Sequence, residues 1–227
     1  MKRLSVLLLF LSFFPLSAQK TSIHTVHFSF PVEFRAMEAK DSPSRKYFDL
    51  DKTFTSRQFG INANWNKVIF YEDGYTLLFG AGAGLSAMNI PEFSSEFFTG
   101  GTLTGKIGFG YAPVRSEKII LSFHGFSGLD IRFLDYYTRY RAPGISDELH
   151  YTNSEINFTA GAGVILLTRL SNSVTLFSGI DFSTVLTGFG SIEVSRFGTS
   201  DEWAELKYTN SFNSVKINPR IGLCWGF

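Results

Sequence analysis

The chain has 227 residues, of which 16% are aromatic and 18% are charged, and its formal net charge is +1. A composition rich in aromatics and poor in charge excludes an intrinsically disordered protein. A near-neutral chain without basic runs is not expected to bind nucleic acid. The single cysteine, Cys224, excludes an internal disulfide, and we interpret it as a small apolar residue of a strand.

The amino terminus has the three parts of a secretion signal. Lys2 and Arg3 form a positively charged start, residues 4–14 are apolar, and the segment that ends at Ala18 reads as a cleavage region. No later segment approaches the ~20 apolar residues that a membrane-spanning helix needs. We therefore predict a signal peptide over residues 1–18, export of the protein, and a single mature domain over residues 19–227.

Beyond the signal, large apolar residues alternate with small or polar ones, which is the pattern of strands with two different faces. Eight strands are predicted, at about residues 24–37, 55–71, 75–87, 101–112, 119–133 and 152–167, from Val174 to about Leu186, and at 215–227. Pro31 is expected to weaken the first strand locally or to mark a bulge. Short turns, such as the Asp73-Gly74 hairpin signal, alternate with long loops at 39–53, 88–100 and 134–151. Residues 190–212 are predicted to form a hairpin that extends beyond the membrane.

The polar face of these strands is unusual, because it consists mainly of Gly, Ser, Thr and Asn with scattered charges. The third strand shows this clearly, with Gly80, Gly82 and Gly84 at every second position. That spacing lacks the motif of a phosphate-binding loop. A soluble barrel would turn its apolar face inward and cover its outside with Lys and Glu. We therefore expect the apolar face to contact lipid, where a charge would cost roughly 2–4 kcal/mol, and the glycines to make room inside a narrow barrel.

The last strand has apolar residues at alternate positions and ends on an aromatic residue: Ile221, Leu223, Trp225 and Phe227. This resembles the closing strand of bacterial outer-membrane barrels, in which such an ending is read by the barrel-assembly machinery. Together with the signal peptide and the alternation of short and long connections, it makes the mature chain similar to small barrels of the OmpA, OmpX and OmpW type.

That resemblance implies an all-β fold, an eight-stranded antiparallel up-and-down transmembrane β-barrel with short periplasmic turns and longer extracellular loops. It places the protein in the bacterial outer membrane, with outer-membrane lipid and the barrel-assembly machinery as partners. We expect a monomer without a cofactor.

Charged residues on the predicted interior face nearly balance in sign. They are Glu33, Arg35, Lys106, Asp130, Arg132, Glu155, Asp181, Lys216 and Arg220. Buried charges are tolerated when they are paired and hydrogen-bonded, so we expect a salt-bridged plug in a lumen too narrow for a water channel. The alternative is a gated polar path, that is, a narrow channel for small hydrophobic or ionic solutes.

His124 also falls on the predicted interior face. Small barrels that modify lipid A use a His with Ser, Asp or Glu, and by that resemblance His124 with Ser122, Asp130 or Glu155 would suggest a lipid-modifying enzyme. No local motif supports this second alternative, and we interpret His124 as a hydrogen-bonded interior residue. No metal-ligand spacing is present, so the sequence predicts neither an enzyme nor a metal site.

Aromatic and arginine residues gather in the third long loop and in the 190–212 hairpin. They are Tyr136, Tyr137, Arg139, Tyr140, Arg141 and Trp203. Tyr, Trp and Arg dominate binding hot spots, although Tyr and Trp also collect at membrane interfaces. The leading prediction is therefore a structural or surface-interaction barrel, adhesion-like, with an extracellular ligand held by these segments.

Overall fold

The computed structural model describes residues 20–40, 52–91, 96–142, 145–171, 174–196, 202–210 and 213–225. They form one antiparallel sheet of ten strands: β1 (Lys20–Ser29), β2 (Val32–Ala39), β3 (Thr53–Tyr71), β4 (Tyr75–Asn89), β5 (Phe98–Arg115), β6 (Ile119–Ala142), β7 (Ile145–Arg169), β8 (Thr175–Arg196), β9 (Glu202–Asn210) and β10 (Ser214–Trp225). The predicted signal peptide lies outside these ranges. Within them, no helix is long and apolar enough to cross a membrane.

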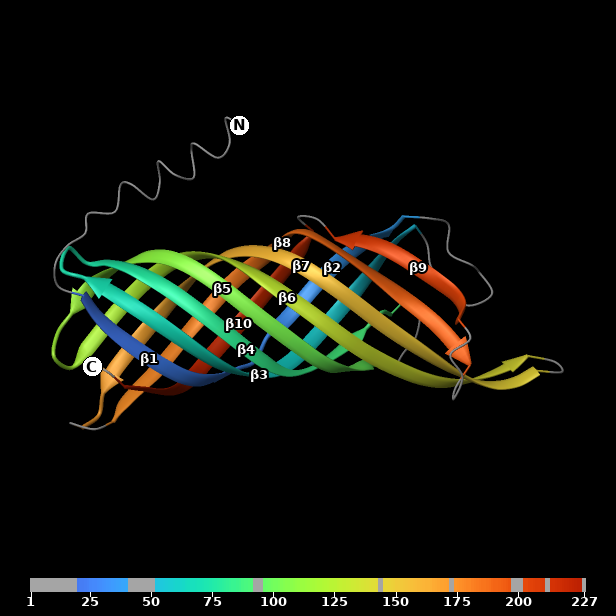
Figure 1. The fold of residues 1–227 in the computed structure, drawn as a ribbon, viewed down its shortest axis with the longest axis horizontal. Helices are drawn as coiled ribbons and strands as arrows, with labels where there is room; N and C mark the ends of the chain where they lie inside the picture. Colours follow the sequence, from blue (N-terminus) through green and yellow to red (C-terminus); the bar gives the residue numbers. More distant parts are fainter. Residues whose placement is uncertain are drawn as a thin grey trace, which may run out of the picture.

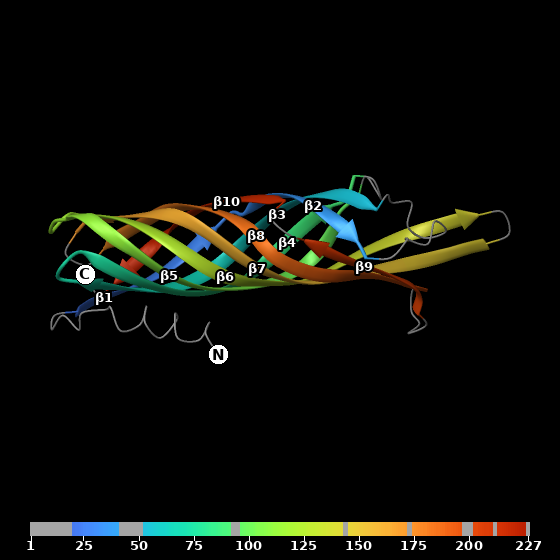
Figure 2. The same ribbon diagram turned by 90° about the horizontal axis from the view of Figure 1, so that it is seen from above.

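The strands from β3 to β8 run up and down, each paired with the next. β1 pairs with β3 on one side and with β10 on the other, and β10 also pairs with β8. β9 pairs with β8 and, through two residues, with β2. The ladder that leaves β3 therefore returns to it, and the ribbon wraps diagonally around one long axis (Figures 1 and 2).

The prediction of eight strands was wrong in number, because the first expected strand is divided and the return arm of the predicted 190–212 hairpin is a strand of its own. β1 ends at Ser29 and β2 begins at Val32, with Pro31 between them. Proline has no N–H for a ladder hydrogen bond, yet its carbonyl accepts one from the Gly60 amide at 3.0 Å, and both pieces pair with β3. β9 is the return arm of the predicted hairpin and is separate from β10, the expected last strand; both pair with β8.

The predicted loop over residues 134–151 was also wrong. β6 and β7 are 24 and 25 residues long, and their pairing continues without interruption from Ile119 and Thr168 to Ala142 and Ile145. The Asp73-Gly74 turn is confirmed, because Gly74 has a φ of 89° and its amide donates to the Tyr71 carbonyl at 3.1 Å. The 190–212 hairpin is present in its described parts, with Gly188 opposite Asn210.

The orientation predicted for the two faces is confirmed. Large apolar side chains such as Phe28, Leu103 and Phe182 point outward and are about half exposed (53%, 52% and 51%). Polar side chains such as Asn66 and Arg132 point inward and are buried. An apolar exterior around a polar interior is the reverse of a water-soluble barrel.

Candidate functional site

The first cluster of the interior is an ion-pair network built from β2, β6 and β7. Arg132 donates to Glu155 at 2.5 Å and to Glu33 at 2.6 Å, and Arg35 donates to Glu155 at 2.8 Å. These four side chains are at most 2% exposed. The Tyr208 hydroxyl on β9 donates to Glu155 at 3.0 Å. Residues at alternate positions of β2 and β6 share the inner face, which is why charges two apart in sequence meet here.

The second cluster is centred on Asp181 of β8. One oxygen of this carboxylate accepts from Arg220 at 2.6 Å and lies 3.2 Å from Nε2 of His124, and the other accepts from Lys106 at 2.9 Å. Lys216 joins the two clusters, because it lines the space beside Asp181 and donates to Asp130 at 2.5 Å. Four strands, β5, β6, β8 and β10, thus contribute to a single charged centre.

The structure places every predicted lumen residue inside the sheet and in an ion pair: Glu33, Arg35, Lys106, Asp130, Arg132, Glu155, Asp181 and Arg220. The partners suggested for His124 need correction. It lies beside Asp181, whereas the Ser122 hydroxyl lies 3.5 Å from that of Thr76. The arrangement is a buried hydrogen-bonded histidine, as the favoured interpretation held.

Sequence reasoning missed two groups of interior residues. Tyr208 was assigned only to the far hairpin, although it reaches back to Glu155. Asn62, Asn64 and Asn66 form an inward row on β3 opposite Gly84, Gly82 and Gly80 of β4, respectively. A Cβ on any of these glycines would overlap the neighbouring asparagine amide oxygen. The sequence contains a signal for this row, because Asn on one strand and Gly on the next recur at every second position.

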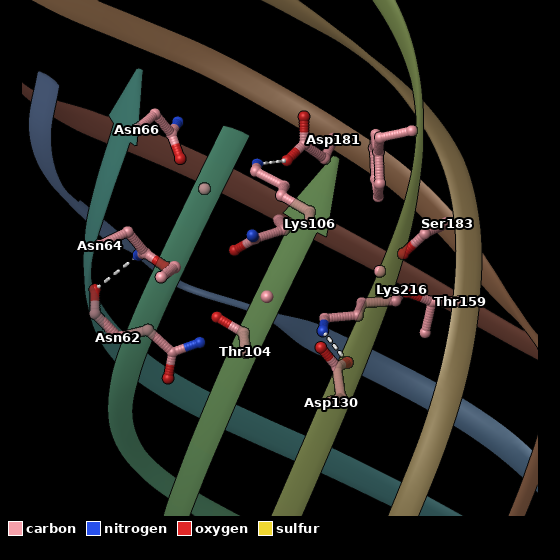
Figure 3. Close-up of a pocket in the computed structure, with 16 residues that line it drawn as sticks. Asn62, Asn64, Asn66, Thr104, Lys106, Asp130, Thr159, Asp181, Ser183 and Lys216 are labelled. Atoms are coloured by element: carbon pink, nitrogen blue, oxygen red, sulfur yellow. Dashed lines mark hydrogen bonds and ion pairs between the residues drawn. The ribbon is translucent and has the colours of Figure 1, made fainter. Parts of the chain in front are cut away.

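Apolar side chains pack the interior on both sides of the charged clusters. Toward the chain termini they are Ile23, Val68, Phe70, Leu78, Ala112, Ile120, Ile165, Leu167, Phe177 and Cys224. Between the clusters lies a polar cavity of about 40 Å³ (Figure 3). The cavity is lined by Asn62, Asn64 and Asn66, by both lysines and by both aspartates. A volume of this size holds a few water-sized groups and no larger solute.

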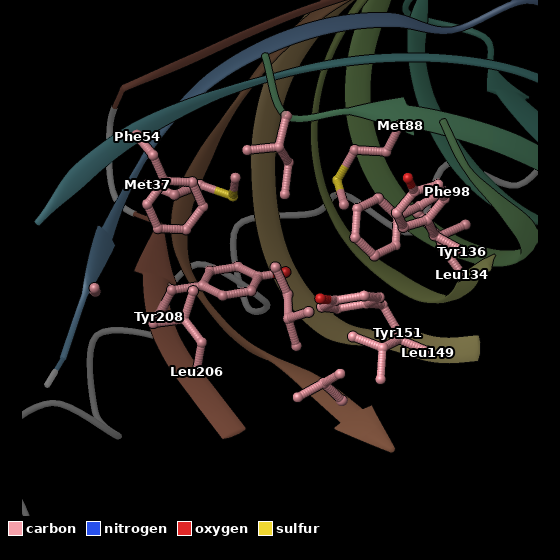
Figure 4. Packing of buried hydrophobic residues seen from close by; sticks show 14 residues of the cluster. Met37, Phe54, Met88, Phe98, Leu134, Tyr136, Leu149, Tyr151, Leu206 and Tyr208 are labelled. Carbon is pink, nitrogen blue, oxygen red and sulfur yellow. The ribbon is translucent and has the colours of Figure 1, made fainter. Parts of the chain in front are cut away.

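At the end far from the chain termini, the polarity of the faces reverses. We call this part the distal extension: β6 after Phe133, β7 before Ser154, β8 after Phe189, and β9. Its inward side chains are apolar and pack with residues from the ends of β2 to β5 (Figure 4). Together, the inward side chains of the distal extension and those that pack with them are Met37, Ala39, Phe54, Met88, Ile90, Phe98, Leu134, Tyr136, Leu149, Tyr151, Ile192, Val194, Leu206 and Tyr208.

The outward residues at the same level are polar. They are Glu38, Lys40, Thr53, Thr55, Arg57, Asn89, Thr99, Asp135, Thr152, Glu193, Glu205 and Lys207. On β6 and β7 they form a small cluster, in which the His150 ring stacks on Tyr137 with centroids 4.4 Å apart and lies 2.9 Å from Asp135. Polar outside and apolar inside is the pattern of a β-structure in water.

The residues predicted as an extracellular binding surface divide into three groups. Tyr137 is exposed, whereas Tyr136 points inward and is 8% exposed, so its assignment to an exposed loop was wrong. The backbones of Arg139, Tyr140 and Arg141 lie in β6 and that of Trp203 lies in β9; their side chains lie outside the described parts.

In the terminal strand, Ile221, Leu223 and Trp225 point outward and are exposed. Phe227 lies outside the described residues. The outward row therefore continues the apolar exterior of the sheet to the end of β10, next to β1, where Val26 lies opposite Leu223.

No protein-family model matches the chain, and no curated protein matches it. Among solved structures it is similar to Ail, the attachment invasion locus protein of Yersinia pestis, at 10% identity and a TM-score of 0.37 over 90% of this chain and 99% of that one. It is similar to the translocator domain of the autotransporter NalP from Neisseria meningitidis at 10% identity and a TM-score of 0.37, over 100% and 94%. The P. putida toluene transporter TodX gives 9% identity and a TM-score of 0.20, over 96% and 92%. Such values assign neither a ligand nor an activity to this chain.

The construction of the chain is that of a bacterial outer-membrane β-barrel protein, the class that its sequence resembles. The described chain is nearly all antiparallel strand. It turns its large apolar residues outward and keeps its ion pairs on the inner side. Those are the features by which a β-structure crosses a lipid bilayer.

Proposed function

We propose that the protein is a closed outer-membrane barrel that does not conduct solutes and that displays the distal extension at the cell surface, where it contacts extracellular partners. The ring has eight positions, with β1 and β2 sharing one and β9 and β10 sharing another. The pairings of β1 with both β3 and β10, and of β10 with β8, support closure. Closure matters in a membrane because every backbone group must be satisfied within the protein.

The reversal of polarity at the distal extension carries this proposal. A membrane crossing takes about 9–11 residues of a tilted strand, whereas β6 and β7 have 24 and 25 residues. The residues beyond Phe133 and Ser154 have an apolar core of their own and a polar outside. Residues of that pattern are stable in water and not in lipid. Residues 134–153, which are 20 of the 51 residues of the longest hairpin (119–169), are therefore available outside the membrane.

The interior supports a role without conduction. The two ion-pair clusters fill the middle, and apolar side chains such as Phe177 and Phe54 fill the two ends. Phe177, Ile165 and Leu167, inward residues compatible with a hydrophobic conduit, pack against one another in a single cluster. The cavity of about 40 Å³ is too small to serve as a path along the axis.

Orientation is tested by labelling single cysteines on intact cells with a membrane-impermeant maleimide. Tyr137→Cys is expected to label, because Tyr137 is exposed in the distal extension. Phe158→Cys, on the apolar exterior, is the matched control and is expected to stay unlabelled. The native Cys224 is buried and contributes little background. Labelling of Asp73→Cys in the opposite turn, without labelling of Tyr137→Cys, would reverse the proposed orientation.

The surface role is tested by shortening the hairpin. Replacing residues 137–150 with Asn-Gly joins Tyr136 to Tyr151, which lie opposite each other, and the dipeptide favours a tight hairpin turn. We expect the shortened protein to reach the outer membrane and to keep its heat-dependent mobility on a denaturing gel. Cells that express it should lose the adherence to protein-coated surfaces that the full protein confers. Unchanged adherence with a normally inserted barrel would contradict the surface role.

A further inference from the structure

The interior carries an excess of one positive charge. Five cationic side chains face four carboxylates among the described residues: Arg35, Lys106, Arg132, Lys216 and Arg220 against Glu33, Asp130, Glu155 and Asp181. A charge removed from water is tolerated when a counter-charge lies within contact distance. One cation of the interior therefore lacks a protein counter-charge.

The excess is located at the Asp181 cluster. In the other cluster, Arg35, Arg132 and Lys216 are matched by the carboxylates of Glu33, Asp130 and Glu155. Asp181 alone faces two cationic side chains, Arg220 at 2.6 Å and Lys106 at 2.9 Å. Arg220 also stacks over the Phe177 ring, with its guanidinium carbon 5.3 Å from the ring centroid. Of these two cations, Lys106 lines the 40 Å³ cavity and Arg220 does not.

The cavity has a second feature that points to a ligand. Asn66 is 0% exposed and lines the cavity, and neither its amide nitrogen nor its amide oxygen has a hydrogen-bond partner among the described residues. Buried amide groups nearly always have hydrogen-bond partners, so an unpaired one indicates that a bound molecule or ion in the adjacent space forms the missing hydrogen bonds. Figure 3 shows Asn66 on β3 and Lys106 on β5 facing the same space across β4.

Gly80 explains how these two side chains reach one another. It lies opposite Asn66 on one side and opposite Lys106 on the other. A Cβ at Gly80 would overlap the Asn66 oxygen and would lie 3.0 Å from Lys106 Cγ. The missing side chain leaves a recess with the Lys106 ammonium group on one wall and the Asn66 amide on the other. An ammonium group has three N–H donors, and among the described residues Lys106 uses one of them, toward Asp181.

We propose that this recess binds a small monovalent anion of halide size, which neutralises the excess charge and accepts hydrogen bonds from Lys106 and Asn66. Thr104 and Ser183, which also line the cavity, are further donors. The two aspartates also line the cavity, and each is engaged in an ion pair, Asp181 with Lys106 and Asp130 with Lys216. A cation is disfavoured by the excess positive charge, and a sulfate ion with its hydration is too large for about 40 Å³. The site is independent of the partner that the distal extension contacts.

The first test compares anions at constant ionic strength. The full-length mature protein is refolded in detergent with sodium chloride, sodium bromide, sodium sulfate or sodium gluconate, and the temperature at which it loses its fast gel mobility is measured. Chloride and bromide should raise this midpoint saturably, by about 5–10 °C at a hundredfold excess over the dissociation constant. Sulfate and gluconate should not. A midpoint that follows ionic strength alone would overturn the proposal.

Two variants separate the anion site from general stability. Lys106→Met removes the excess charge, so its midpoint should no longer respond to halide. Asn66→Asp places a carboxylate beside Lys106 and supplies the missing counter-charge. We expect this variant in gluconate to be as stable as the wild-type protein in chloride, and to gain nothing from halide. Lys67→Met, which removes the neighbouring outward-facing lysine, is the control and should keep the full halide response.

The Asn66→Asp variant keeps the proposal falsifiable if Lys106→Met fails to fold. A site that holds only water predicts that a buried carboxylate at position 66 destabilises the barrel and leaves its halide response unchanged. Bromide soaked into crystals provides an independent check, because its anomalous signal should appear between Lys106 and Asn66. Absence of that signal in crystals of protein refolded in bromide would also overturn the proposal.

Discussion

Arg132 lies directly opposite Glu155 in the β6–β7 ladder and donates to it at 2.5 Å, with both side chains at most 2% exposed. Glu155 also accepts from Arg35, which is 120 residues away in the sequence. One carboxylate thus joins two arginines from strands that are distant in the chain. This pairing ties the first described strands to the middle of the sheet.

Loss of the Glu155 charge is expected to destabilise the barrel strongly. Glu155→Gln leaves two buried arginines short of a carboxylate, and breaking a buried pair in this way costs about 3–5 kcal/mol. Urea unfolding of the refolded protein in lipid vesicles measures the change. The double variant Glu155→Gln, Arg35→Met should recover part of the loss, because it removes one uncompensated charge. The exposed Lys52–Glu38 pair is the control, and Lys52→Met should cost under about 1 kcal/mol.

Glycines that border backbone should not tolerate a methyl group, whereas outward-facing glycines in open space should. A Cβ at Gly84 would overlap the Ile61 carbonyl oxygen, while a Cβ at Gly105 meets nothing within 4 Å. Gly84→Ala is expected to cost about 1–3 kcal/mol through overpacking. Gly105→Ala should stay within about 0.5 kcal/mol of the wild-type protein. Equal effects of the two changes would contradict the close packing of β3 against β4.

Charged substitutions on the outer face should map the membrane. Ile107 is outward-facing and exposed on β5 between Leu103 and Phe109. Ile107→Arg is expected to cost roughly 2–4 kcal/mol in lipid vesicles, the cost of an arginine near the bilayer midplane. Tyr137→Arg should cost under about 1 kcal/mol, because the distal extension is proposed to lie outside the membrane. A comparable loss at both positions would place the distal extension within the membrane.

The interior packing predicts that the reconstituted protein does not conduct. Planar bilayers that contain it should show no stable ion conductance, because apolar clusters fill both ends of the interior. Arg132→Ala should leave the bilayer silent as well, since it affects only the middle. Discrete conductance steps in the wild-type protein would support a channel in place of a filled barrel.

The sequence by itself determined which face of each strand is polar. Alternation assigns every residue to one of two faces, and the scarcity of Lys and Glu on the polar face indicates that this face is the interior. For this reason the charged residues that the structure places inside the sheet, from Glu33 to Arg220, could be listed from the sequence. The extent of the strands was harder to predict. From Leu134 onward the apolar residues of β6 lie on the inner face instead of the outer face, although the strand continues without a break. In the sequence this shift interrupts the alternating pattern, and such an interruption resembles the start of a loop.

Only the tertiary structure decided which charges meet. Asp181 and Arg220 are 39 residues apart, and His124 is 57 residues from Asp181. These pairings depend on the register between strands and on their tilt around the axis, and no local pattern encodes either quantity. The division of the first strand at Pro31 also followed from its partners, because β3 and β10 each pair with both pieces. The sequence specified the composition of the interior, and the arrangement of the strands specified its contacts.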